Sequence, residues 1–241
     1  AIGSEGIQFT NGYSGHSSCA PSRASLMSGR YPTRFGFEFT PTPGSMLKVI
    51  SSIIEEQKGL PHSITHFDEH VDKVVPYEEM GMPTEEITLA ETLKKGGYHT
   101  VHIGKWHLGR YNGMAAKDQG FDESLLMHSG MYLPEDDPNV VNSKQDFDPI
   151  DKFLWKGMQY AASFNSGDVF KPGGYLTDYY TDEAVKTIAA NKNRPFFLYL
   201  AHWAPHTPLQ ATKADYDALS HIKNHRLRVY AAMIRSLDRG V

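Results

Sequence analysis

Two segments of the chain share the same order, in which a helix pattern leads through a turn into an apolar strand. The first begins at Thr88, which stands three residues before a glutamate as in a capping box, and runs through a Gly-Gly pair into residues 98–103. The second runs from a helix pattern at 181–190 into the apolar stretch 196–201. Helices that alternate with apolar strands predict an α/β fold with a mostly parallel central sheet flanked by helices.

A third strand is predicted at Ile7–Tyr13, where apolar and polar residues alternate. A short helix is predicted after it, with Pro21 early in the helix, Ser17 or Ser18 as its cap and Gly29 at its end.

The remaining segments have weaker patterns. Residues 35–82 and 130–171 are predicted to be irregular, with one helix near 47–57. Such insertions either shape a substrate pocket or form solvated surface loops. Apolar residues at helical spacing predict an amphipathic, core-facing helix across 221–238.

Four side chains with reactive or charged groups follow the predicted strands. Cys19 comes after the first strand, Lys105 and His107 after residues 98–103, and His206 after residues 196–201. Ligands of parallel sheets bind beyond the carboxyl ends of the strands. The sequence therefore predicts that these residues meet at one edge of the sheet.

Composition excludes several classes of protein. A single cysteine rules out a disulfide framework and a Cys-rich zinc site. The net charge of -4 offers no electrostatic footprint for nucleic acid or an anionic membrane surface. No apolar stretch approaches the length of a membrane span, and the first residues lack the basic and apolar regions of a signal peptide.

The segment that begins at Cys19 reads C-A-P-S-R-A-S-L-M-S-G. It resembles the type I sulfatase signature, C-x-P-S-R-x-x-L-x-x-G, at all its specified positions. This resemblance implies that a sulfatase-maturing enzyme, such as the formylglycine-generating enzyme, oxidises Cys19 to formylglycine. A nucleophile at a helix N-terminus meets unpaired backbone N–H groups that suit a bound sulfate. Arg23, one turn later, offers forked donors to the same anion.

Two further segments resemble the same family. G-Y-H-T-V-H-I-G-K-W-H-L-G at 97–109 implies that Lys105 binds sulfate oxygens and that His107 holds the formylglycine hydroxyl and accepts its proton. A-P-H-T-P-L at 204–209 implies that His206 contacts the ester oxygen of the substrate. His99 and His102 lie on the strand and are interpreted as structural, and His202 as a packing or supporting residue.

The family resemblance also implies a calcium ion, bound by Cys19 as formylglycine and by acidic residues. The paired aspartates of the family would precede Ile7, its Asp-Asn pair would follow Val241, and Asp136-Asp137 lacks the strand context. Residues 1–241 are therefore predicted to be a partial sulfatase catalytic domain, truncated at both ends. Alone it is expected neither to bind calcium tightly nor to turn over substrate.

The resulting hypothesis is a sulfuric ester hydrolase that cleaves sulfate monoesters through a formylglycine hydrate. The first alternative is a formylglycine-dependent phosphonate or phosphate ester hydrolase, and the second is a binding protein or inactive fragment. A sulfated saccharide is favoured over a simple aryl sulfate, and the family favours a periplasmic, extracellular or lysosomal location. Several aromatic residues could either stack on a sugar or pack in a core: Trp155, Tyr160, Tyr175, Tyr179 and Tyr180.

Overall fold

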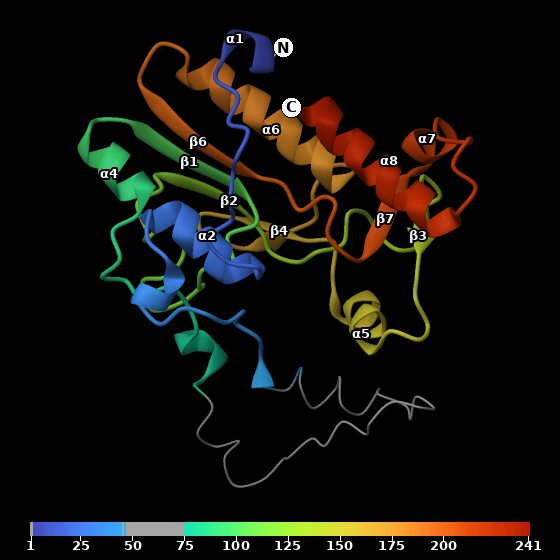
Figure 1. Cartoon of the computed structure of the whole chain (residues 1–241), viewed down its shortest axis with the longest axis horizontal. Coiled ribbons are helices and arrows are strands. Elements are labelled where there is room, and N and C mark those ends of the chain that lie inside the picture. Colours follow the sequence, from blue (N-terminus) through green and yellow to red (C-terminus); the bar gives the residue numbers. More distant parts are fainter. Residues whose placement is uncertain (1, 45, 47–74) are drawn as a thin grey trace, which may run out of the picture.

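The computed structural model describes residues 2–44, 46 and 75–241 (Figure 1). The helix predicted near 47–57 lies outside the described residues. Among the described helices, none combines the length and the apolar character that crossing a lipid bilayer requires. The helices are α1 (Ile2–Glu5), α2 (Cys19–Ser28), η1 (Pro32–Arg34), η3 (Tyr77–Glu79), α4 (Leu89–Lys95), α5 (Pro149–Gly157), α6 (Leu176–Asn191), α7 (Lys213–Asp217) and α8 (His225–Gly240). The strands are β1 (His99–Gly104), β2 (Glu123–Met127), β3 (Val140–Ser143), β4 (Ala162–Phe164), β5 (Val169–Phe170), β6 (Phe196–Ala201) and β7 (Leu209–Thr212).

The central sheet has the strand order β5-β4-β2-β1-β6. Strand β1 pairs in parallel with both β2 and β6, whereas β4 and β5 add antiparallel pairs at one side. A separate antiparallel pair joins β3 and β7. The predicted α/β class is confirmed, and the sheet is mixed, with its parallel part limited to β2, β1 and β6.

Helices cover both faces of this sheet (Figure 1). Val101 and Ile103 of β1 pack in one apolar cluster with residues of α6 and α8. Phe197 and Tyr199 of β6 pack in a second cluster with residues of α2 and α4. Because successive side chains of a strand point to opposite faces, apolar residues on both faces require a helical layer on each side.

The strand predicted at Ile7–Tyr13 is wrong. Residues 6–18 form neither helix nor strand, and Ile7, Phe9 and Tyr13 are 82%, 81% and 93% exposed. Alternation indicates a strand only where one face is buried and the backbone has a pairing partner, and neither holds here. Cys19 consequently does not follow a strand in the described part of the chain.

The prediction that 130–171 is irregular is also wrong, because this segment contains β3, α5, β4 and β5. The signal for α5 was present. The Asp148 side chain accepts hydrogen bonds from the amides of Ile150 and Asp151, and a proline opens the helix. Strand β2 was missed as well, since its five residues carry no alternating pattern.

The two long helices, α6 and α8, are confirmed, but the start of α6 and the buried face of α8 differ from the prediction. Helix α6 begins at Leu176, before the predicted 181–190. Helix α8 buries Val229, Ala232 and Met233, but Tyr230 and Ile234 of the predicted apolar face are 40% and 42% exposed. The buried face of α8 therefore contains more small residues than the sequence pattern of large apolar residues predicts.

The capping box of α4 is confirmed and gives a stability prediction. The Thr88 hydroxyl accepts from the Glu91 amide at 3.1 Å and donates to the Gln119 carbonyl at 2.8 Å, while fully buried. We expect Thr88→Ala to lower the free energy of unfolding by about 2 kcal/mol, because it removes the cap and leaves a buried carbonyl unpaired. Urea unfolding measures this, and Thr88→Ser should retain most of the stability. Equal loss in both variants would contradict the hydrogen-bond explanation.

Candidate active site

Cys19 is the first residue of α2, so its side chain lies where the helix has unpaired amides. The N-cap, Ser18, is extended and makes no side-chain cap, and its hydroxyl instead lies 2.8 Å from Thr40 Oγ1. Cys19 Sγ is 3.5 Å from His107 Nδ1 and 3.9 Å from Thr40 Oγ1. A residue from the first helix turn and one from a segment 88 residues later therefore share one site.

The end of β1 sets the position of Lys105 and His107. Gly104 has φ +108°, and a Cβ there would stand 2.1 Å from the Ala201 carbonyl oxygen of β6, so only glycine fits. The Lys105 amide donates to that same oxygen at 2.8 Å. His107 has φ +66°, a left-handed backbone that is uncommon for histidine and that recurs at functional sites.

Lys105 is 5% exposed, and its ammonium lies 4.4 Å from the ring centre of Trp203. Burial lowers the pKa of Lys105 to about 8, against the raising effect of the neighbouring Cys19 and with a further lowering by Arg23. The cation–π contact with Trp203 stabilises the charged form in this buried position. The site thus holds a lysine cation at neutral pH.

His206 stacks on the same aromatic residue, Trp203. Its ring centre is 3.7 Å from that of Trp203, and Nδ1–H donates to the Thr207 carbonyl at 2.7 Å, which leaves Nε2 without a hydrogen-bond partner among the described residues. Burial lowers the pKa of His206 to about 4; the Thr207 bond raises it, and Lys105 and Arg23 lower it further. Burial, followed by Lys105 and Arg23, lowers the pKa of His107 to about 3. Both imidazoles are therefore neutral at pH 7 in the ligand-free pocket.

The Arg23 side chain bonds two other segments of the site rather than the Cys19 thiol. Its Nη1 donates to the Lys105 carbonyl at 2.8 Å and to the Tyr199 hydroxyl at 3.1 Å. The guanidinium therefore ties α2 to β6 and to the end of β1. Its charge also lowers the pKa values of Lys105, His107 and His206.

One pocket of about 450 Å³ is lined by four of the five predicted residues, Cys19, Lys105, His107 and His206, whereas Arg23 does not line it. This volume is typical of small-molecule sites. The aromatic residues of the pocket are Tyr77, Trp106, Phe153 and Trp203.

None of the aromatic residues that the sequence proposed for sugar stacking lines the pocket. Trp155, Tyr175 and Tyr180 are buried, Tyr179 packs against the core, and the Tyr160 hydroxyl bonds the carbonyls of 172 and 174. Trp203 and Thr40 were missed. Trp203 lies between the strand and the A-P-H segment, which was a usable signal, whereas Thr40 has no motif.

The histidines interpreted as structural lie away from the pocket. His102 is fully buried, with Nδ1 2.9 Å from Ser124 Oγ, and burial lowers its pKa to about 3. His99 pairs with Glu123 at 2.8 Å. His202 is partly buried, and neither ring nitrogen has a partner among the described residues.

The described residues do not form a calcium site. Calcium prefers six to eight oxygen ligands, several of them carboxylates. Within 2–44, 46 and 75–241, no group of three or more His, Cys, Asp or Glu side chains could hold a metal ion. Around Cys19 the described partners are Lys105, His107 and Thr40, of which only Thr40 offers a side-chain oxygen.

The site therefore combines the N-terminus of α2, which presents Cys19, with Lys105, His107 and His206 in one pocket, on a sheet that helices cover on both faces. Unpaired helix amides and a buried cation suit the binding of an oxyanion. The whole chain, residues 1–241, matches the Sulfatase family, and the chain belongs to that family.

Similar proteins agree with this membership. The chain is 28% identical to the uncharacterized sulfatase YdeN of Escherichia coli K12 over 246 residues, covering 98% of this chain and 37% of the relative. It is 30% identical to human N-acetylgalactosamine-6-sulfatase over 218 residues, covering 88% of this chain and 35% of the relative. The crystal structure of Ps i-CgsB superimposes with a TM-score of 0.66 at 30% identity, covering 95% of this chain and 44% of that one. The chain thus spans between a third and a half of the length of these proteins.

Proposed function

We propose that the protein hydrolyses sulfate monoesters through a formylglycine made from Cys19. The observation that carries this proposal is the position of Cys19 Sγ at the start of α2, 3.5 Å from His107 Nδ1 and in one pocket with Lys105 and His206. The thiol sulfur stands in for an oxygen of the formylglycine hydrate. The modification itself is proposed from the family signature and requires a maturing enzyme as partner.

The proposed reaction has two covalent steps. In the first, one hydroxyl of the hydrate loses its proton to solvent as its oxygen attacks sulfur, and the bond between sulfur and the alcohol oxygen breaks. The alcohol oxygen takes a proton from Nε2 of His206, which solvent has protonated beforehand. In the second, His107 accepts the proton of the other hydroxyl, the carbon–oxygen bond to sulfate breaks, and the aldehyde re-forms. Water then adds to the aldehyde. Dividing a difficult displacement into two steps lowers the barrier of each.

The charges of the pocket support these roles. Lys105 is a cation at neutral pH and can bind sulfate oxygens. His206 is neutral without substrate because it is buried near Lys105 and Arg23. A bound sulfate ester adds a negative charge beside the ring, which raises the pKa of His206 and allows it to carry the proton that the alcohol needs.

The substrate class proposed is a sulfated saccharide. It is supported by the names of relatives, N-acetylgalactosamine-6-sulfatase among them, and by Ps i-CgsB, which was also solved in complex with k-i-k-neocarrahexaose. Residues 1–241 are proposed to be one part of a longer catalytic domain, to which the calcium expected for the family also belongs. The location expected from the family, outside the cytoplasm, stays an expectation.

The function is tested on the complete gene product, co-expressed with a sulfatase-maturing enzyme. We expect release of inorganic sulfate from 4-nitrophenyl sulfate and from a sugar sulfate, at a kcat/KM far above that for the matching phosphate and phosphonate esters. A preference for phosphate or phosphonate would favour the phosphoryl alternative. No release from any ester by correctly modified protein would favour the non-catalytic alternative.

Trp203 gives a prediction about positioning. Its ring contacts the Lys105 ammonium at 4.4 Å and the His206 imidazole at 3.7 Å, so one residue orients both groups. We expect Trp203→Leu to lower kcat/KM for a sugar sulfate about 10-fold, since a partly buried cation–π contact is worth 1 to 2 kcal/mol. Trp203→Phe keeps a ring but loses the hydrogen bond to the Gly130 carbonyl, and it should recover most of the loss. If Trp203→Phe had no higher kcat/KM than Trp203→Leu, with both variants equally stable to heat, an aromatic ring at this position would not be what orients Lys105 and His206.

A further inference from the structure

The pocket contains a cation that the proposed reaction does not use. Arg110 lines the pocket and donates from Nη2 to the His128 carbonyl at 2.8 Å. Among residues 2–44, 46 and 75–241 it has no carboxylate partner, and no Asp or Glu lines the pocket there. Its charge still acts inside the pocket, because it contributes to the lowered pKa values of His107 and His128.

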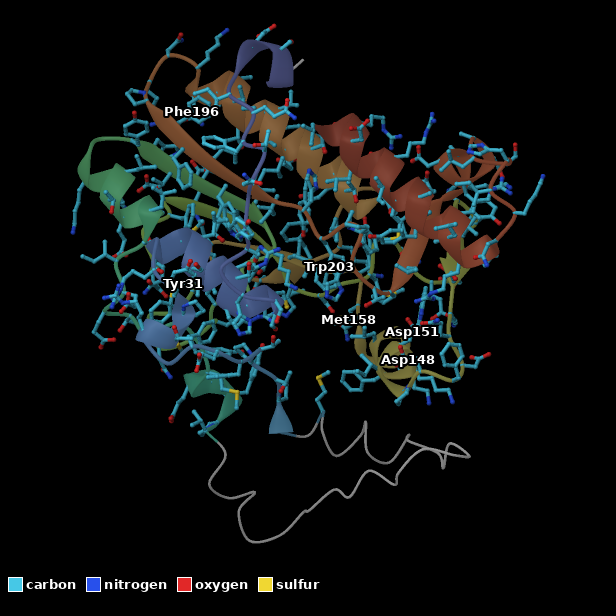
Figure 2. The ribbon with its side chains drawn as sticks, in the orientation of Figure 1. Tyr31, Asp148, Asp151, Met158, Phe196 and Trp203 are labelled. Atoms are coloured by element: carbon cyan, nitrogen blue, oxygen red, sulfur yellow. The ribbon has the colours of Figure 1, made fainter. Side chains whose placement is uncertain are left out.

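Arg110 belongs to a continuous wall that leads from the reactive centre to α5. Its partner His128 directly precedes Ser129, whose hydroxyl lies 3.6 Å from Met158 Sδ at the end of α5. Gly130 then packs between Trp203 and Met158, because a Cβ there would meet the Trp203 ring at 3.0 Å and Met158 Sδ at 3.1 Å. Figure 2 labels Met158 and Trp203, which lie near each other.

Helix α5 supplies the apolar part of this wall through Ile150, Phe153 and Leu154. Ile150 is 52% exposed although it is a large apolar side chain on the pocket. An apolar helix face that shares a pocket with a guanidinium lacking a carboxylate partner among the described residues suits a ligand with a flat, largely C–H surface and a negative substituent at its edge. A sugar ring with an anionic group has this combination.

We propose that Arg110, with His128 beside it, binds a second anionic substituent of the saccharide, a sulfate or a carboxylate, while α5 covers the sugar ring. A sulfate monoester carries one negative charge, and Lys105 already lines the pocket beside Cys19 as a cation. We therefore expect the substrate to carry a second anionic group, with which Arg110 pairs. This inference rests on the proposed sulfatase function and specifies its substrate as a polyanionic saccharide.

The experiment compares four substrates on the complete, modified gene product: 4-nitrophenyl sulfate, galactose 6-sulfate, galactose 4,6-disulfate and galactose 6-sulfate linked to glucuronate. We expect the wild type to prefer one of the two doubly charged sugars, and the preferred one identifies the second group as sulfate or carboxylate. Arg110→Gln should lower kcat/KM for that sugar by roughly 10- to 100-fold, the worth of one charge-assisted hydrogen-bonded contact. The nitrophenyl ester carries no second anion, so its kcat/KM should fall far less, and its turnover reports that the variant is folded.

Two variants sharpen the comparison. Arg110→Lys keeps the positive charge but loses the forked N–H donors of the guanidinium. It should recover part of the preference for the doubly charged sugar that Arg110→Gln loses. Lys117→Gln removes one charge from an exposed residue outside the pocket, and it should leave all four substrates unchanged.

Two outcomes would overturn the inference: a wild type that does not favour either doubly charged sugar, or an Arg110→Gln variant that slows all four substrates alike. Failure of the proposed function is distinguishable from both, because the wild type would then release sulfate from none of the substrates.

Discussion

Cys19→Ala is expected to lower sulfate-ester turnover by up to about 10⁶-fold, the scale on which other hydrolases lose activity without their covalent nucleophile. The loss follows because the side chain at the first turn of α2, 3.5 Å from His107 Nδ1, is the proposed source of the formylglycine. The measurement is single-turnover release of nitrophenolate by the complete gene product after co-expression with a maturing enzyme.

Peptide mass spectrometry of the segment that spans Cys19 gives the independent readout. Wild type should carry an aldehyde in place of the thiol. Ser28→Ala, at an unspecified position of the signature on the same helix, should be modified and active, since its hydroxyl bonds the backbone of Ala24 and Arg30 and does not line the pocket. Finding only the thiol in an active wild-type protein would mean that the covalent mechanism is wrong.

The second large effect is expected at His206. His206→Ala should slow hydrolysis of a sugar sulfate by about 10²- to 10⁴-fold, the usual worth of a general acid. Nitrophenyl sulfate should be affected far less, because nitrophenolate leaves readily without a proton whereas a sugar alkoxide does not. The free Nε2 of a ring held through its Nδ1–H to the Thr207 carbonyl is the atom that would carry this proton.

His107→Ala is the contrasting variant. Expulsion of sulfate from the enzyme is the same step for every substrate, so its effect should not depend on the leaving group. Single-turnover rates are compared so that bond cleavage limits both substrates. Equal slowing of both substrates by His206→Ala would show that this histidine only positions the sulfate and that another group is the acid.

The local elements could be predicted where short-range signals were strong. The capping box at Thr88 and the apolar run that became β6 each depend on neighbours within a few residues, and both were found. The Asp-Pro start of α5 was an equally local signal that the loop composition around it concealed. The apparent strand at Ile7–Tyr13 failed because a strand depends on a pairing partner and a buried face, which no local pattern contains.

The sequence by itself determined the reactive residue types and their order, because the signature around Cys19, the Lys105 and His107 pair, and His206 are each contiguous segments. Only the tertiary structure decided how these segments meet. It placed Trp203 in contact with both Lys105 and His206, brought Thr40 to the thiol, and tied the Arg23 guanidinium to the Lys105 carbonyl. It also placed Arg110 on the pocket, where none of the described lining residues is an Asp or Glu. The physical reason is that motif spacing reflects local backbone geometry, whereas contacts across 88 residues depend on how two helical layers and a mixed sheet pack around a common core.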